Sequence, residues 1–127
     1  IRQTILFPAP PEAVYNLLLD AKALTAMHGA KAVISRRAQG RFSIFDGYCT
    51  GRHIELIPGK KIIQTWHFKE EGWPEDHDSH CTFSLTKTSK GTKLTFLQKG
   101  VPEFKARQLS DGWIVYFWFP MLQYLLK

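Results

Sequence analysis

The chain has 127 residues and a mass of 14.6 kDa, the size of one domain with a single core, so residues 1–127 are expected to form one domain. Its apolar fraction of 44% and charged fraction of 22% exclude a disordered tail, a collagen-like repeat and a disulfide-based miniprotein. The net charge of +6 favours acidic partners. The cations are dispersed and form no basic tract, so no nucleic-acid binding is expected.

The start of the chain predicts a strand followed by two short helices. Residues 1–7 alternate in polarity and form the expected strand. A helix is predicted from Pro11, because proline suits a first helical turn and the apolar residues after it recur at i, i+3, i+4 and i+7. A second helix is predicted over 21–27, with Asp20 at its start and Gly29 just past its end.

The middle of the chain has apolar residues with a period of two, which is typical of strands. Six strands are predicted, near 31–37, 40–46, 48–57, 60–68, 79–88 and 92–100. The dipeptides Asp46–Gly47, Pro58–Gly59 and Lys90–Gly91 mark the turns between them, and 72–78 is a longer polar loop. Successive antiparallel strands form a meander, which the first strand extends to a seven-stranded sheet.

Two cysteines, Cys49 and Cys81, fall on predicted strands with one strand between them. Strands two apart in a sheet are separated by about 9.5 Å, which is too far for a disulfide. We therefore expect reduced thiols and a cytoplasmic protein. No apolar run reaches the ~18 residues of a membrane span, so stable membrane insertion is not expected.

The last part of the chain, Trp113–Leu126, is almost entirely apolar and predicts a long helix buried on more than one side. Pro120 should kink or restart this helix, because proline removes an amide and clashes with the preceding turn. Trp113 and Trp118 are five positions apart, about 140° around an α-helix. Only one of them should point inward, and we expect Trp118 on an outward apolar patch that serves a partner or a homodimer.

The expected fold is α+β, a curved seven-stranded antiparallel sheet wrapped around a long C-terminal helix, with two short helices after the first strand. If the helix stands off the sheet, aromatic side chains line a cavity; if it docks tightly, they fill a core. The sequence leaves both alternatives open. The side chains expected to face this space, and to bind any apolar ligand there, are Phe42, Ile44, Ile54, Trp66, Phe83, Phe96, Trp113 and Phe117.

Candidates for catalysis are few. The chain has no G-x-S-x-G elbow, phosphate loop or dinucleotide fingerprint. Cys49 and His53 lie on one predicted strand, which leaves a nucleophile pair open, although a small strand cysteine is usually inert packing. We expect no catalytic residue, no cofactor and no enzymatic activity.

One segment has the composition of a metal site. Glu75, Asp76, His77, Asp78 and His80 fall within six positions. A zinc site needs fixed geometry and usually ligands from another element, whereas these residues share one loop. We interpret the segment as a solvated polar loop and expect no specific metal.

Several motifs, in order along nearly the whole chain, resemble one known family. The run PPEAVYNLLLDAKALTAM resembles the opening P-x-E-x-V-[WY]…L-x-[DN] of the activator of heat-shock protein 90 ATPase homologues. The run GRFSIFDGYCTGRHIELIPGKKIIQTWHF resembles that family's G-G-x-F…x-D-G…x-G-x-x-x-E-L-x-P-x-x-x-I-x-x-x-W core, with a single glycine in place of two. The segments WPEDH, GTKLTFLQKGVP and DGWIVYFWFPMLQYL continue the likeness.

The resemblance implies a START-like helix-grip fold. The aromatic side chains between sheet and helix favour a non-enzymatic domain that binds a small hydrophobic ligand or an apolar segment there. The resemblance implies the alternative, a co-chaperone accessory domain that docks on heat-shock protein 90 and modulates its ATPase. An enzyme of the same fold is a distant third, because no acid–base pair is visible.

Overall fold

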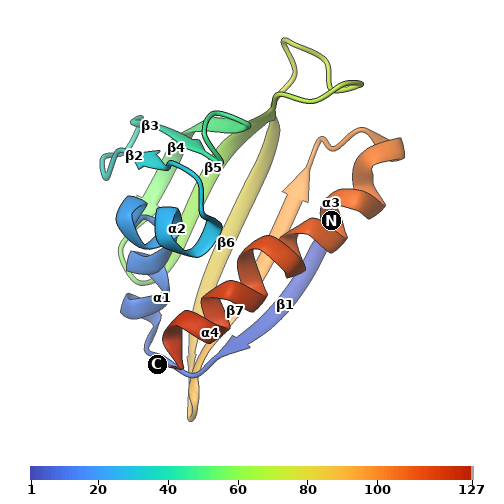
Figure 1. Cartoon of the computed structure of the whole chain (residues 1–127). Coiled ribbons are helices and arrows are strands. Elements are labelled where there is room, and N and C mark those ends of the chain that lie inside the picture. The colour runs from blue at the N-terminus through green and yellow to red at the C-terminus, as the bar shows by residue number, and fades with distance from the viewer. Residues whose placement is uncertain (127) are drawn as a thin grey trace.

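The computed structural model describes residues 1–126, which form one sheet and a set of helices on one of its faces (Figure 1). The strands are β1 (Arg2–Phe7), β2 (Val33–Ile34), β3 (Arg41–Ile44), β4 (Cys49–Ile57), β5 (Lys61–Phe68), β6 (Ser79–Thr88) and β7 (Gly91–Lys99). The helical segments are α1 (Pro11–Leu18), α2 (Ala21–His28), a 3₁₀ turn η1 (Glu103–Lys105), α3 (Ala106–Trp113), a π-helical turn η2 (Ile114–Trp118) and α4 (Phe119–Leu125).

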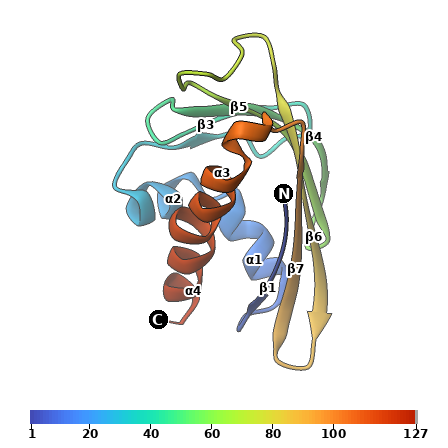
Figure 2. The same ribbon diagram turned by 90° about the vertical axis from the view of Figure 1, so that its right-hand side faces the viewer.

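The sheet is an antiparallel meander with the order β1-β7-β6-β5-β4-β3-β2, as the alternation predicts. The first strand closes one edge by pairing with the last, so that Ile5 lies opposite Leu94. The sheet bends over the helices, with β3 and β5 above them and β6 and β7 beside them (Figure 2). The fold is therefore the expected α+β helix-grip arrangement.

The turns follow the predicted dipeptides, with one strand shorter than expected. Gly59 adopts a φ of +71° in the three-residue turn between β4 and β5, which favours glycine. The strand predicted over 31–37 is reduced to Val33–Ile34. After it the chain turns, with the amide of Arg37 bound to the Ser35 hydroxyl, and Gln39 has a φ of +68°.

A bulge in β4 overturns one of the expected site positions. His53 pairs with Gln64 and Glu55 pairs with Ile63, which leaves Ile54 as the extra residue. The extra residue shifts the alternation by one position, so His53 is fully buried and Ile54 is only half-buried, outside the core. The prediction that Ile54 faces the helix is wrong for this reason.

The C-terminal helix starts earlier than predicted and contains a π-helical turn. It begins at Ala106 and is restarted at Pro120, which lies in the first turn of α4. The turn before it has i→i+5 hydrogen bonds, which bring residues five apart to nearly the same side. Trp113 and Trp118 are therefore both buried, with rings stacked at 5.5 Å, and the expectation that Trp118 points outward is wrong.

Candidate functional site

The space between the sheet and the C-terminal helix is filled by aromatic rings. Trp113 is the centre of this cluster, with its ring centroid 4.3 Å from that of Phe96 and 4.9 Å from that of Trp66. Phe117 lies 4.7 Å from Trp113 on the helix side, and Phe83 lies 5.1 Å from Phe96 on the sheet side. Contacts at these distances are those of a close-packed interior. The predicted inward face is thus a packed core over most of its area.

Glutamines on the inward face of the sheet accept hydrogen bonds from the indole N–H groups of this cluster. Trp66 Nε1 donates to Gln64 Oε1 at 2.7 Å, and Trp113 Nε1 donates to Gln98 Oε1 at 2.8 Å. Trp118 Nε1 makes the same contact with the side chain of Gln3, the third inward glutamine, at 2.7 Å. Because a buried N–H needs a partner, these glutamines let large indoles fill the interior without a polar ligand.

His53 extends one of these contacts to the backbone. Its Nε2 donates to the Ser35 carbonyl at 2.7 Å, and its Nδ1 accepts from Gln64 Nε2 at 3.1 Å. A carbonyl oxygen only accepts, so this arrangement requires a neutral imidazole with its proton on Nε2. Burial lowers the pKa of His53, in agreement with that state. Both nitrogens are occupied, so His53 cannot act as a base for a nearby thiol.

The cavities that remain along this interface are small. One internal void of about 10 Å³ lies between Phe42, Ile44 and Trp66, at the lower limit for one water molecule. An open cleft of about 120 Å³ lies at one end of the helix. Pockets for drug-sized ligands measure about 300–1,000 Å³, so this cleft has room for a single side chain or a small fragment.

The cleft includes only part of the predicted site. Of the expected residues, Trp66, Trp113 and Phe117 line it. Phe42, Ile44, Phe83 and Phe96 are buried elsewhere in the core, and Ile54 lies outside it. The prediction missed the remaining apolar walls, which are Phe45, Tyr48, Phe68, Leu109 and Tyr116. Phe45 and Tyr48 flank the Asp46–Gly47 turn, so their position beside a predicted hairpin was the one sequence signal that could have placed them at the cleft.

An ion pair contacts one wall of the cleft through Tyr48. Lys105 Nζ donates to Glu70 Oε1 at 2.8 Å, and the Tyr48 hydroxyl donates to Glu70 Oε2 at 2.7 Å. The hydrogen bond from Lys105 lowers the pKa of Glu70, so the carboxylate stays charged. Burial and the adjacent Glu70 raise the pKa of Tyr48. These contacts connect the start of the long loop, the β3–β4 turn and η1 at one point.

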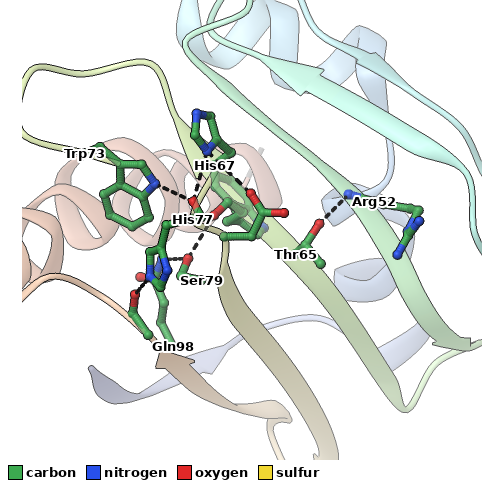
Figure 3. A network of polar contacts seen from close by, with 10 residues as sticks. Arg52, Thr65, His67, Trp73, His77, Ser79 and Gln98 are labelled. Atoms are coloured by element: carbon green, nitrogen blue, oxygen red, sulfur yellow. Dashed lines mark hydrogen bonds and ion pairs between the residues drawn. The ribbon is translucent and has the colours of Figure 1, made fainter. Parts of the chain in front are cut away.

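The long loop after β5 is more ordered than its polar sequence predicts. Trp73 is buried, with its ring 4.9 Å from that of Phe68. The His77 carbonyl accepts from Trp73 Nε1 at 2.8 Å and from His67 Nδ1 at 3.0 Å (Figure 3). On β6 and β7, the Gln98 amide donates to Ser79 Oγ at 2.9 Å. The predicted polar loop over 72–78 thus contains a buried tryptophan that packs it against the sheet.

Within residues 1–126 both cysteines are buried, and the candidate metal ligands do not converge on one point. Burial raises the pKa of both Cys49 and Cys81, which disfavours the reactive thiolate. Within those residues no three His, Cys, Asp or Glu side chains gather in a metal-binding arrangement. His77 in the candidate loop binds the Gly100 carbonyl. In the same range no helix is long and apolar enough to cross a bilayer.

Comparison with known proteins gives one family. Residues 8–124 match the family described as Activator of Hsp90 ATPase homolog 1-like protein. The chain is 34% identical over 102 residues to an uncharacterised Schizosaccharomyces pombe protein, covering 80% of this chain and 30% of that protein. It is 28% identical over 111 residues to the human Activator of 90 kDa heat shock protein ATPase homolog 1, covering 87% and 32%.

A solved structure agrees over most of both chains. The crystal structure of an HSP90 activator from Plasmodium falciparum superposes with a TM-score of 0.79 at 27% identity, covering 89% of this chain and 86% of that one. The chain spans about a third of the length of the two curated relatives above.

Proposed function

The chain belongs to the family of Activator of Hsp90 ATPase homolog 1-like proteins, and from that membership we propose that it is a non-enzymatic accessory domain that docks on heat-shock protein 90. The human relative is named as an activator of the 90 kDa heat shock protein ATPase and the Plasmodium falciparum relative is described as an HSP90 activator, which supports this proposal. The observation that carries it is the filled interior. Because aromatic rings of the domain itself fill the space between sheet and helix, the domain is better suited to bind a partner protein on its surface than to enclose a ligand in its interior.

The C-terminal helix supplies an apolar surface for that contact. Ile114, Val115, Tyr116 and Phe119, here called the apolar strip, are 50–57% exposed. They lie on the solvent side of the π-helical turn and of the start of α4. Contiguous exposed apolar side chains of this kind mark interaction sites. The proposed docking surface is this strip.

Calorimetric titration of the full chain with full-length heat-shock protein 90 tests the proposal. Val115→Glu and Phe119→Glu place a charge in the strip and should each weaken binding at least about tenfold, because a desolvated charge without a partner is costly. Stimulation of the chaperone's ATPase should fall in parallel. Leu6→Glu is the matched control, since Leu6 is 67% exposed on β1 and lies outside the strip.

Three outcomes would contradict the docking proposal. The first is no binding by the unmodified chain, and the second is equal weakening by Leu6→Glu. The third is a stable dimer in sedimentation that Val115→Glu dissociates while chaperone binding persists. In that case the apolar strip is the homodimer surface expected from the sequence.

The cleft beside the strip supports a second candidate, the binding of a small apolar ligand or of one apolar side chain. Its walls are predominantly aromatic, and Leu109 lies on the helix side. Native mass spectrometry of gently purified protein should then show a stoichiometric adduct that is lost on unfolding. Leu109→Trp should fill the cleft and remove the adduct, whereas Leu126→Trp, at a 71% exposed position, should retain it. A bare mass for the unmodified chain would reject a resident ligand.

A further inference from the structure

The outer face of the sheet, opposite the helices, is strongly basic. Outward positions of the strands alternate with the buried ones, so the register identifies them. The lysines and arginines at these positions are Arg2, Arg41, Arg52, Lys61, Lys93 and Lys99. At the outward positions of the described strands, these six basic residues stand against one acidic residue, Glu55. Six of the chain's 17 lysines and arginines therefore share one face.

Two of these cations are direct neighbours. Arg41 on β3 lies opposite Arg52 on β4, and both side chains are exposed. Like charges directly opposite one another destabilise a sheet. The ion pairs within residues 1–126 are Lys105 with Glu70 and His67 with Asp78, so neither arginine forms an ion pair with a carboxylate of those residues. A bound anion would remove this repulsion.

The arginine pair borders a shallow groove of about 570 Å³, which runs between the outer face of β3–β5 and the long loop. Ser43, Thr50 and Thr65 also line it and add hydroxyl groups. Thr65 Oγ1 accepts a hydrogen bond from the Arg52 amide at 3.0 Å (Figure 3). Its own hydroxyl hydrogen is thus free to donate to a ligand. The groove combines two guanidinium groups with neutral donors.

The chemistry of the groove favours a polypeptide over a nucleic acid. Each guanidinium can bind one carboxylate through two parallel hydrogen bonds. The long-loop side of the groove carries Glu75 and Asp78, which would repel a continuous phosphate backbone but leave room for a chain of mixed side chains. Outward positions of the described strands carry no phenyl, phenol or indole ring on which bases could stack.

We propose that the groove around Arg41 and Arg52 is a docking site for an acidic segment of a partner polypeptide. The side-chain carboxylates of that segment bind the arginine pair, and its remaining length follows the outer face of the sheet. Arg41 and Arg52 occupy outward positions of β3 and β4, whereas the C-terminal helix lies on the other face of the sheet (Figure 2). The site does not depend on the apolar strip or on the identity of the chaperone.

Fluorescence anisotropy with a labelled twelve-residue peptide of alternating Glu and Ser tests the site. The full chain should bind it at low salt, and the affinity should fall as salt rises. The double variant Arg41→Ala/Arg52→Ala should lose at least about tenfold in affinity and show a shallower salt dependence. Lys22→Ala/Lys90→Ala removes the same charge from exposed positions off this face and should change the affinity less than about twofold.

Further variants and ligands test whether the paired hydrogen bonds of the guanidinium groups matter and which class of ligand binds. Arg41→Lys/Arg52→Lys keeps the charge but loses the bidentate fork, so it should bind more weakly than the unmodified chain. A single-stranded oligothymidine of similar charge should bind less tightly than the peptide. The proposal is overturned if the peptide does not bind, if both alanine pairs weaken it equally, or if the oligonucleotide or phosphatidylserine vesicles bind more tightly. Circular dichroism of each variant verifies the fold.

Discussion

At the scale of single residues, the interior depends on polar side chains placed on strand faces that otherwise bury hydrocarbon. Gln64 connects Trp66 to His53, and His53 passes the contact to the Ser35 carbonyl. A buried polar group without a partner costs about 1–3 kcal/mol. Protonation of His53 would therefore break its hydrogen bond with Gln64 and disturb the whole series of contacts.

Because His53 is buried as a neutral imidazole, we expect the protein to lose stability in mild acid. Burial holds the pKa of His53 below its usual value in the folded state, while the unfolded residue titrates near the ordinary ~6.5. Below about pH 6.5 the unfolded chain binds a proton that the folded chain does not, so the free energy of unfolding falls as pH falls, by up to ~1.4 kcal/mol per pH unit. Above that pH this residue adds no pH dependence.

Urea unfolding at several pH values between 5 and 8 measures this effect. His53→Gln removes the titration while keeping an amide that can donate and accept, so its stability should decline less steeply in acid. Exposed His80→Gln should keep the original slope. Equal slopes for His53→Gln and the unmodified chain would show that His53 is not responsible.

At the scale of elements, Gly51 lets three strands pack closely. It lies between Phe42 on β3 and Trp66 on β5 in one cross-strand row, and the two rings meet at 5.1 Å. A Cβ at this position would collide with the Phe42 ring and with the Thr65 carbonyl. The glycine thus provides the space that these two large side chains need.

Gly51→Ala should therefore destabilise the fold. Overpacking a filled core typically costs about 1–3 kcal/mol, and a backbone oxygen cannot move aside as a flexible side chain does. Gly112→Ala is the control, because its Cβ would meet only Tyr116 Cδ2 at 3.8 Å within α3. That change should leave stability unchanged or raise it by up to about 1 kcal/mol. Thermal melts of both variants measure the difference, and a Gly51→Ala melt at or above that of the unmodified chain would contradict it.

The elements themselves were predictable from the sequence, whereas single-residue shifts in phase were not. Alternation and turn dipeptides predicted the meander, and the C-terminal apolar run predicted the helix. The bulge at Ile54 and the π-helical turn before Trp118 each add one residue to a regular repeat. A periodic pattern does not anticipate such an insertion, so the predicted orientations of Ile54 and Trp118 were wrong.

At the scale of the whole molecule, the residues that make surfaces were harder to predict than those that make the core. Most of the expected site residues are buried together, because hydrophobicity identifies a core. The cleft instead depends on how Leu109 and Tyr116 from the helix meet the β3–β4 turn. Its location is a property of docking between distant segments, which spacing along the chain does not encode.

The reactivities of the two cysteine thiols measure the packing at the cleft and in the core separately. Cys49 lines the cleft, whereas Cys81 is completely buried in the core. Iodoacetamide should modify Cys49 first, through local opening at the cleft, and Cys81 only at the rate of global unfolding. Peptide mapping by mass spectrometry at increasing urea concentrations measures the two rates. Earlier modification of Cys81, or rapid modification of both in native buffer, would contradict the packed interior.

The pairing of the first strand with the last has a consequence for the order of folding. The backbone nitrogen of Ile1 donates to the Gln98 carbonyl 97 positions away, and Gln3 contacts Ser110 and Trp118 at separations of 107 and 115. Contacts so distant in the chain form slowly, because a long loop must close first. During synthesis β1 has no partner until β7 has been made. The beginning of the chain is then among the last segments to reach its native place, and it does so together with the end.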